Sequence, residues 1–303
     1  MSDVLPYDNR DGFIWFNGNL VPWREAKIHI LCHGLHYSSA VFEGERAYNG
    51  VVYKMAEHSQ RLIDGAKELD FKIPYTVEEI NQATQQVVAA NSLSNCYIRP
   101  ISWRGSDTMG VSARKSTVNL AIAAWQWDSY FSMEERLKGI RVCWAKYRRP
   151  DPMTAPTKTK ATGLYMIGTV EKNRAEKQGC SEALMLDWRG RVAECTSGNI
   201  FFVSGQELHS PIPDCFLDGI TRRTIIKLAM RRGYRCVDRV IMPEELKDFN
   251  ECFMVVTAAE VTSIKEIGQY TFKPSYITEN MLRDYTLEVC PGKTESSEKH
   301  MSL

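Results

Sequence analysis

Two Asn-Gly pairs near the start of the chain constrain its fold most strongly. Asn17-Gly18 and Asn49-Gly50 each stand between two short apolar runs. Asn and Gly tolerate the positive φ angles that a two-residue hairpin turn requires, so each pair predicts a β-hairpin. The first hairpin is expected over 13–21, and the second joins 40–48 to 51–54. Two hairpins so close together predict that the chain begins with an antiparallel sheet.

Apolar residues at helical spacing follow these hairpins. Segments 57–69 and 76–90 both show this spacing, and Thr76-Val-Glu-Glu79 has the form of a capping box. Two further strands are expected at 96–103 and 116–127. The segment 1–128 is therefore predicted to be a smaller α+β domain in which helices cover one antiparallel sheet.

A more polar stretch at 129–135 is predicted to link this domain to a larger one at 136–303. A length of 303 residues agrees with about two domains. In the second domain, strands are expected at 140–145, 183–186, 192–193, 200–203, 237–241 and 252–256, and helices at 163–177, in the stretch 216–230 after Gly219, at 243–249 and at 276–289.

The charge balance and the cysteines bear on partners and compartment. Lys and Arg number 38 against 37 Asp and Glu, so no overall field favours nucleic acid or an anionic membrane, and small-molecule partners are expected. The nine cysteines form no Cys-x-x-Cys pair, which indicates reduced thiols and a cytoplasmic location. No export signal or membrane-spanning segment is expected.

A histidine-rich segment, His29 to His36 with Cys32 and His33, raises the question of a metal site. If this segment is extended, successive side chains point to opposite faces and cannot converge on one ion. The sequence therefore predicts no bound metal.

Two lysines, Lys158 and Lys160, stand just before the helix expected at 163–177. An amine on a flexible stem can form an imine with an aldehyde, although most lysines near a helix start are solvated surface groups. The residues alone leave both lysines and both interpretations open.

Two segments rich in small residues could bind an anion. Gly219 precedes a helix start, whose first N–H groups and the Thr221 hydroxyl could hold a phosphate. Thr257-Ala258-Ala259 follows a predicted buried strand and could leave N–H groups open to a ligand. An ordinary glycine turn and tight packing are the alternative interpretations.

Several ordered sequence blocks resemble one enzyme family. Glu194-Cys-Thr-Ser-Gly-Asn199-Ile-Phe, followed by Leu217-Asp-Gly-Ile-Thr-Arg222, resembles the signature of the class IV (fold type IV) pyridoxal-phosphate aminotransferases. The resemblance extends from about Phe13 to Val289, and ordered blocks are more specific than any single motif. Blocks that resemble the branched-chain amino-acid aminotransferases are His36-Tyr-Ser-Ser-Ala-Val-Phe-Glu-Gly44, His58-Ser-Gln-Arg61-Leu, Tyr97-Ile-Arg-Pro100, Met109-Gly-Val111, Lys160-Ala-Thr-Gly-Leu-Tyr165 and Thr257-Ala-Ala-Glu260.

The resemblance implies pyridoxal 5'-phosphate (PLP) as the cofactor and gives roles to the matching residues. Lys160 resembles the lysine that bonds covalently to the cofactor and later moves a proton between substrate and cofactor. Glu194 resembles the carboxylate that keeps the pyridine nitrogen protonated, and Tyr165 the tyrosine that is hydrogen-bonded to the phenolate oxygen. The other cofactor-binding residues that it implies are Arg61, Ile220, Thr221 and Thr257 around the phosphate, and Leu217 against the ring.

The resemblance also implies a substrate site. Tyr97 and Arg99 are two residues apart on a predicted strand, so their side chains share a face. In the family resembled, the tyrosine helps to bind the α-carboxylate, the arginine binds the distal carboxylate of 2-oxoglutarate, and N–H groups like that of Ala258 also bind the α-carboxylate. The apolar pocket for Leu, Ile or Val side chains would be formed by Tyr37, Phe42, Gly44, Val111, Trp127 and Tyr130, with plain core packing as the alternative for the aromatic residues.

In this family the loop of Val111 belongs to the partner subunit, so a homodimer is implied. The fold implied is a two-domain α+β fold, with an antiparallel sheet and helices in the N-terminal domain and a β-meander or pseudo-barrel with helices in the C-terminal domain. The function implied is that of an L-branched-chain amino-acid aminotransferase with a ping-pong mechanism. A D-amino-acid or amine aminotransferase, an aminodeoxychorismate lyase of the same fold, and a cofactor-binding protein without turnover remain alternatives.

Three residues depart from the family pattern. Ser210 stands where the signature usually has Thr, which keeps the hydroxyl. Asp218 places an acid beside the predicted phosphate site, where repulsion is expected unless the side chain points away or caps the helix. Glu45 replaces a residue that is often apolar, and strand alternation predicts that it faces away from the pocket.

Overall fold

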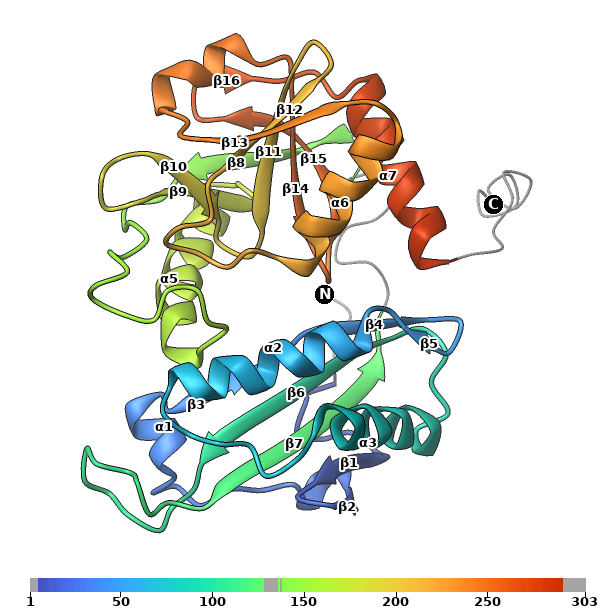
Figure 1. The fold of residues 1–303 in the computed structure, drawn as a ribbon, viewed down its shortest axis with the longest axis vertical. Helices are drawn as coiled ribbons and strands as arrows, with labels where there is room; N and C mark the ends of the chain where they lie inside the picture. Colours follow the sequence, from blue (N-terminus) through green and yellow to red (C-terminus); the bar gives the residue numbers. More distant parts are fainter. Residues whose placement is uncertain (1–4, 128–135, 137, 291–303) are drawn as a thin grey trace. The chain divides into compact units, whose positions relative to one another are not determined.

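The computed structural model describes residues 5–127, 136 and 138–290, and the chain divides into two compact units (Figure 1). The N-terminal unit comprises Met1–Asp128 and Thr159–Met166, and the C-terminal unit comprises Ser129–Lys158 and Ile167–Leu303. Lys160 thus belongs by its contacts to the N-terminal unit, although it lies within the range 136–303 predicted for the larger domain. The linker predicted at 129–135 lies outside the described residues.

The N-terminal unit contains one antiparallel sheet of seven described strands in the order β2-β1-β7-β6-β4-β5, with β3 paired to β6. Asn17, Gly18, Asn49 and Gly50 all have positive φ angles, so both predicted hairpin turns are confirmed. The strands are β1 (Phe13–Phe16), β2 (Asn19–Pro22), β3 (Ala40–Phe42), β4 (Glu45–Tyr48), β5 (Val51–Val52), β6 (Cys96–Arg104) and β7 (Val118–Gln126).

Two helices, α2 (Met55–Glu68) and α3 (Val77–Ala90), cover one face of this sheet (Figure 1). The capping box is confirmed, because Thr76 Oγ1 accepts from the Glu79 N–H and Glu79 Oε2 accepts from the Thr76 N–H. Apolar side chains between helices and sheet form the core, among them Val41, Leu62, Ile80, Val87, Ile98, Leu120 and Ile122. The opposite face of the sheet carries Phe42, Tyr97 and Arg99 by register.

The segment around His33 forms the short helix α1 (His33–Tyr37). It is therefore not extended, and the prediction of an extended segment, on which a metal site was excluded, is wrong. His33 Nδ1 lies 2.6 Å from Ser39 Oγ, and its Nε2 lies 3.1 Å from the Gly110 carbonyl oxygen. The Nε2 atom of His36 lies 2.9 Å from the Ile30 carbonyl oxygen. These histidines therefore have protein partners that hold their rings.

The C-terminal unit contains a mixed sheet of nine described strands in the order β10-β9-β8-β15-β14-β11-β12-β13, with β16 paired to β15. The pairs β8–β9, β8–β15 and β12–β13 are parallel, and the other pairs of this sheet are antiparallel. The strands are β8 (Ile140–Trp144), β9 (Glu182–Leu186), β10 (Val192–Cys195), β11 (Asn199–Ser204), β12 (Glu207–Pro211), β13 (Arg235–Arg239), β14 (Glu251–Val256), β15 (Glu260–Ile267) and β16 (Tyr270–Thr271).

Helix α5 (Tyr165–Lys177) follows the 3-10 turn Thr162–Leu164; its first two residues belong to the N-terminal unit and the rest to the C-terminal unit. Helices α6 (Ile220–Arg231) and α7 (Tyr276–Val289) belong to the C-terminal unit. The helix predicted at 243–249 is a 3-10 helix, Pro243–Asp248. Helices α6 and α7 pack on the sheet through β13, β14 and β15.

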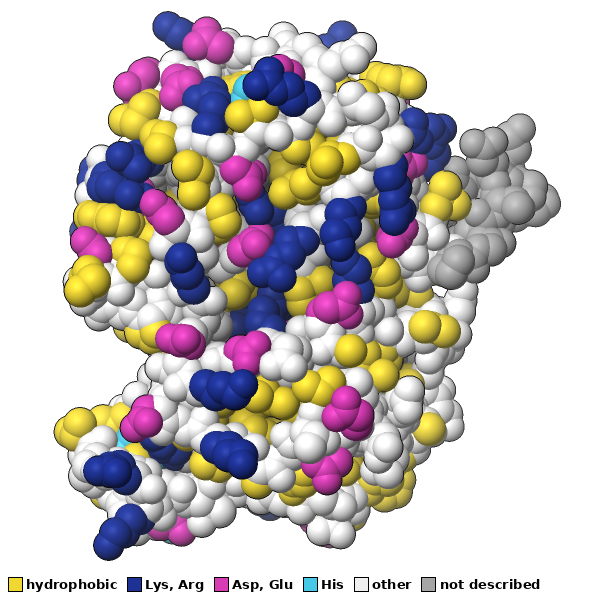
Figure 2. Space-filling view, in the orientation of Figure 1, with side chains coloured by type: hydrophobic (Ala, Val, Ile, Leu, Met, Phe, Trp, Pro, Cys, Tyr) yellow, Lys and Arg dark blue, Asp and Glu magenta, His cyan; other side chains and the backbone are white. Residues whose placement is uncertain are grey.

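Every helix in the described part of the chain is too short or too polar to cross a membrane. Figure 2 shows basic and acidic side chains interspersed over the visible face, in keeping with the net charge of +1.

Candidate active site

Lys160 lies in a short extended segment that pairs with β3. The Phe42 N–H donates to the Lys160 carbonyl oxygen at 3.1 Å, and Ala161 forms a bridge with Val41. The Lys160 side chain is half-buried, and its Nζ donates to the Tyr165 hydroxyl oxygen at 2.6 Å. The same Nζ lies 4.8 Å from the ring centroids of both Phe42 and Tyr165. The backbone and two aromatic rings therefore position this amine.

The structure separates the two candidate lysines. Thr157 and Thr159 are buried, whereas Lys158 between them is exposed. Lys160 alone of the two lies against aromatic rings and a hydroxyl, which favours it as the reactive amine.

Tyr97 and Arg99 lie together on the sheet face opposite the helices. Arg99 Nη2 donates to the Tyr97 hydroxyl at 3.1 Å, and Arg99 Cζ lies 4.8 Å from the Phe42 ring centroid. A Cβ added to Gly44 would lie 2.0 Å from the Tyr97 hydroxyl, so only glycine permits this approach. The ring of Trp127 lies 5.7 Å from that of Tyr97. Phe42, Gly44, Tyr97, Arg99 and Trp127 therefore form one cluster.

Other predicted pocket residues lie differently. Val111 is 82% exposed and Tyr37 is 45% exposed, so neither is packed into the buried cluster around Tyr97. Tyr130 lies outside the described residues.

Trp125, which sequence reasoning missed, lies beside Tyr97 with 5.3 Å between ring centroids. Its position opposite Tyr97 in the β6–β7 register is the signal that would have found it.

Arg61 of α2 is held by a buried carboxylate. Arg61 Nε and Nη2 donate to the two oxygens of Glu43 at 2.6 and 2.7 Å, and His58 Nδ1 lies 2.7 Å from the same carboxylate. Burial alone would raise the pKa of Glu43, but Arg61 and His58 hold it well below its ordinary value. Burial lowers the pKa of His58, which favours its neutral ring. Arg61 is thus fixed in orientation. A guanidinium has five N–H donors, so those that do not bind Glu43 can donate to an anion.

Glu45 is a second buried carboxyl, at the start of β4 and two residues after Glu43. It pairs with Ile98 of the helix-covered core, so it faces away from Tyr97 and Arg99 as alternation predicted. Among the described residues, neither of its side-chain oxygens has a hydrogen-bond partner. Burial and the nearby Glu43 charge raise its pKa well above the ordinary value, so the neutral form is favoured.

In the C-terminal unit, Glu194 lies on β10 and is paired with a cation that sequence reasoning did not single out. Arg149 Nε lies 3.2 Å from Glu194 Oε1, and both residues are buried. Arg149 stands in the Arg148-Arg-Pro-Asp-Pro loop and is placed by its N–H, which donates to the Leu186 carbonyl oxygen. Buried carboxylates are normally paired, so a basic partner for Glu194 was to be expected. The sequence did not indicate that Arg149 is this partner.

The start of α6 suits an anion. Its N-cap, Gly219, has no side chain and therefore offers the first N–H groups of the helix no acceptor of its own. Ile220 and Thr221, the first two helical residues, are buried. Leu217 is half-buried just before them, and Thr257 and Ala258 lie in the turn between β14 and β15. These residues all belong to the C-terminal unit.

Asp218 does not leave an unpaired negative charge beside this helix start. Arg222 Nη1 and Arg223 Nε each donate to its carboxylate at 2.8 Å. Arg222 Nε also donates to the Ser210 hydroxyl at 3.1 Å, so the departure at 210 keeps a hydrogen bond. The repulsion expected from Asp218 is therefore offset by two guanidinium groups.

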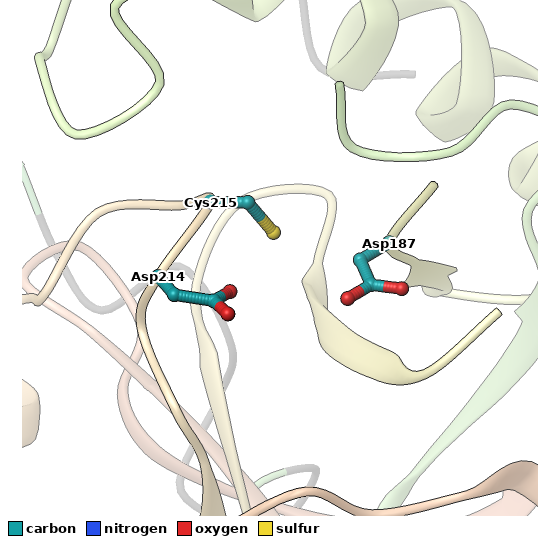
Figure 3. Close-up of side chains that lie close together, drawn as sticks. All are labelled: Asp187, Asp214 and Cys215. Atoms are coloured by element: carbon teal, nitrogen blue, oxygen red, sulfur yellow. The ribbon is translucent and has the colours of Figure 1, made fainter. Parts of the chain in front are cut away.

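One further group has the composition of a metal site. Asp187, Asp214 and Cys215 point toward one another, as Figure 3 shows. Arg189 Nε donates to Asp187 at 2.8 Å and its Nη2 donates to Asp214 at 2.7 Å. Burial raises the pKa of the Cys215 thiol to about 12, which disfavours the thiolate that binds metals. The arrangement is that of an arginine bridging two acids.

Comparison with known proteins identifies the family. Residues 40–267 match the family described as amino-transferase class IV. The branched-chain-amino-acid aminotransferase of Pseudomonas aeruginosa is 37% identical over 302 residues, covering 97% of this chain and 98% of that protein. A probable branched-chain-amino-acid aminotransferase of Rickettsia felis is 39% identical over 277 residues, covering 90% of this chain and 94% of that protein.

Solved structures agree with these relatives. The branched-chain amino acid aminotransferase of Escherichia coli superposes with a TM-score of 0.89 at 34% identity, covering 91% of this chain and 94% of that one. The branched-chain aminotransferase of the archaeon Thermoproteus uzoniensis, solved with norvaline, gives a TM-score of 0.89 at 33% identity, covering 95% of this chain and 97% of that one. The chain therefore belongs to the class IV, fold type IV, PLP-dependent aminotransferases, in the branched-chain-amino-acid aminotransferase family.

Proposed function

We propose that this chain transfers an amino group between L-Leu, L-Ile or L-Val and 2-oxoglutarate by a ping-pong exchange. The observation that carries the proposal is a shared aromatic ring: Lys160 Nζ and Arg99 Cζ each lie 4.8 Å from the Phe42 ring centroid. An amine and a carboxylate-binding guanidinium thus flank one apolar surface. The relatives described above are branched-chain-amino-acid aminotransferases, which supports Leu, Ile and Val as the amino donors.

The residues fit PLP, which is the cofactor of this family. When bound, PLP supplies an aldehyde for an amine and a ring that withdraws electrons from the substrate Cα. The N-terminal unit carries Lys160 for the aldehyde and Tyr165 for the phenolate oxygen. The C-terminal unit carries Glu194 for the ring nitrogen and the uncapped α6 start for the phosphate, with Thr257 as a further donor. Arg61 would add a guanidinium to the phosphate.

The chain's own groups then divide the work of the reaction. Lys160 holds and moves the proton at the substrate Cα, because its nitrogen is the basic group held between Phe42 and Tyr165. The Tyr165 hydroxyl fixes the position of that nitrogen. Glu194 would keep the ring nitrogen of bound PLP protonated, and Arg149 compensates the charge of the buried carboxylate.

Dual specificity follows from the mixed character of the cluster around Arg99. Phe42, Tyr97 and Trp127 offer apolar surface to a branched side chain, whereas Arg99 offers its charge to the distal carboxylate of 2-oxoglutarate. Arg99 Nε is buried without a hydrogen-bond partner among the described residues, so a bound carboxylate would satisfy it.

The test is an amino-donor panel with 2-oxoglutarate as acceptor, read by oxo-acid formation. L-Leu, L-Ile and L-Val should react, while D-Ala and a chiral primary amine should react at least about 100-fold more slowly: the amine has no α-carboxylate to bind, and D-Ala presents its carboxylate and Cα hydrogen in the opposite configuration. Activity confined to D-Ala or the amine would contradict the proposal. Pyruvate release without an amino acceptor would indicate the lyase instead.

A homodimer is part of the proposal. Exposed apolar side chains gather on and before α1, namely Ile28, Ile30, Leu31, Leu35 and Tyr37, with exposures of 45–68%. The Tyr37 hydroxyl donates to the Met109 carbonyl oxygen, which ties these residues to the loop of the exposed Val111. Contiguous exposed apolar residues of this kind mark an interface, and a second copy of the chain would cover them.

Light scattering after size-exclusion chromatography tests the dimer. The double variant Leu35→Asp, Val111→Asp should dissociate at concentrations where the wild type is dimeric. The control Met230→Asp, at an exposed residue of α6, should stay dimeric. A monomeric wild type would contradict this part of the proposal.

A cytoplasmic location is also proposed, supported by nine cysteines that are all free.

A further inference from the structure

Asn199 begins β11 and lies buried between two elements of the proposed cofactor site, with 5% of its surface exposed. Its Nδ2 donates to the Leu217 carbonyl oxygen at 2.9 Å and to Glu194 Oε2 at 3.4 Å. Its Oδ1 accepts from the Gly219 N–H at 3.2 Å. One side chain therefore contacts both the carboxylate on β10 and the backbone that leads into α6.

These partners suit an amide and exclude most replacements. An Asn amide offers two N–H donors and a carbonyl acceptor, and here it meets two acceptors and one donor. An aspartate has no N–H to donate, and it would place a second negative charge beside Glu194. A leucine of similar size would leave the Gly219 N–H and the Leu217 carbonyl without these partners.

Gly219 supplies an independent sign of this contact. A Cβ at Gly219 would lie 2.4 Å from Asn199 Oδ1, closer than any side chain allows. The backbone before α6 therefore approaches Asn199 as closely as only glycine permits.

The hairpin that carries Glu194 and Asn199 is itself anchored. The Cys195 N–H donates to the Gly198 carbonyl oxygen at 2.9 Å and closes the turn between β10 and β11. The Ser197 hydroxyl donates to the buried carboxylate of Glu182 at 2.7 Å. Because the turn is held in this way, a displacement of Asn199 is expected to reach Glu194 and the helix start together.

We propose that Asn199 is a positioning residue that fixes Glu194 and the start of α6 relative to each other, and so sets the spacing between the groups for the ring nitrogen and for the phosphate. This inference rests on the proposed function, because it needs PLP to bind Glu194 and the α6 N–H groups. Asn199 touches neither the substrate nor the reacting atoms in this account. It acts through the two groups that it holds.

The experiment uses the variants Asn199→Asp and Asn199→Leu and measures two contacts of the cofactor separately. These are the contact of its phosphate with the start of α6, called the phosphate end, and the contact of its ring nitrogen with Glu194, called the ring end. The phosphate end is read as the ratio of the dissociation constants of pyridoxal, which has no phosphate, and PLP. The ring end is read as the pH dependence of the absorbance of the bound cofactor. We expect the ratio to fall about 10–100-fold, the size of one or two lost hydrogen bonds, and the pH midpoint to move.

Asn280→Asp is the matched control. Asn280 is buried in α7 of the same unit, and its Nδ2 donates to the Tyr234 hydroxyl at 2.9 Å, away from the residues assigned to the cofactor. It should lose stability without changing the affinity ratio or the pH midpoint. If the control moves both readouts as far as the Asn199 variants do, the effect is general destabilisation and the inference fails.

Gly219→Ala decides the question if the Asn199 variants do not fold. The added methyl group would press on Asn199 Oδ1 without touching Glu194, so the inference predicts that the ring-end pH midpoint shifts. An unchanged midpoint would overturn it, as would Asn199 variants in which only one end changes. A wild type that does not bind PLP at Lys160 would instead refute the proposed function, so the two failures are distinguishable.

Discussion

Lys160 Nζ and the Tyr165 hydroxyl lie 2.6 Å apart, at the point where the segment paired with β3 turns into α5. The hydroxyl is five residues along the chain from the amine, and the 3-10 turn Thr162–Leu164 brings the two together. The backbone thus places an amine and a phenol side by side. Preorganisation of this kind lowers the cost of reaching a reactive geometry.

Tyr165→Phe should keep the ring and remove the hydroxyl. We expect kcat with L-Leu to fall about 10–100-fold, because the amine loses the hydrogen bond that positions it. The cofactor should remain bound, because Lys160 is unchanged. Single-turnover absorbance measurements would show both results, with Tyr147→Phe, at a half-exposed tyrosine, as the control. An unchanged kcat would show that the hydroxyl has no part in the reaction.

Arg99→Ala should separate the two classes of acceptor. We expect kcat/KM for 2-oxoglutarate to fall about 100-fold or more, because a distal carboxylate loses its cation. Branched-chain oxo acids, which have no distal charge, should lose less than about 10-fold. Steady-state assays with both acceptors provide the comparison, and equal losses would refute the role of Arg99.

Arg149→Leu should leave the Glu194 carboxylate buried without its cation. We expect the free energy of unfolding to fall by about 3–5 kcal/mol, the usual cost of breaking a buried ion pair from one side. The double variant Arg149→Leu, Glu194→Gln should recover part of that loss, since no charge is then buried. Denaturant unfolding curves measure both. A loss below about 1 kcal/mol in the single variant would mean that the pair is not buried in solution.

Glu45→Gln should stabilise the protein at alkaline pH. The folded-state pKa of Glu45 is raised above its ordinary value of 4.5, so the folded state holds this proton more tightly than the unfolded state does. Stability from this group is therefore fully present below about pH 4.5 and is lost as the pH rises toward the folded-state pKa.

Glutamine does not ionise, so the variant should escape this loss. We expect a gain of about 2–4 °C in Tm at pH 8, equivalent to about 1 kcal/mol, which shrinks toward pH 5. Thermal unfolding from pH 5 to 8 tests the trend. Glu57→Gln, at an exposed residue of α2, should show no such dependence. A gain that is the same at every pH would contradict the ionisation argument.

The N-terminal unit was the more predictable from sequence. Its turns depend on Asn-Gly pairs and its α3 helix on a capping box, and such signals act between neighbours in the chain. The C-terminal unit depends more on pairing between distant strands. Strand β15 pairs in parallel with β8, which lies far from it along the chain, and it carries Glu260, Thr262, Ser263 and Lys265, so it lacks an apolar run.

In the candidate site too, features set by neighbouring residues were predictable and contacts between distant residues were not. The alternation of Tyr97 and Arg99 on one strand face was predictable from their spacing. The pairing of Arg61 with Glu43 and of Arg149 with Glu194 was not, because each joins residues on different elements whose packing local patterns do not encode. Residues named from the resemblance, such as Arg61, therefore needed the structure to show what holds them.

The measurement that tests the central claim most directly is peptide mass spectrometry after the PLP-loaded protein is reduced with borohydride. Reduction makes the link between cofactor and amine permanent, so the modified lysine can be identified. The account predicts one phosphopyridoxyl group on Lys160, and none on the exposed Lys158 two residues away. A label on any other lysine, or no label at all, would contradict it.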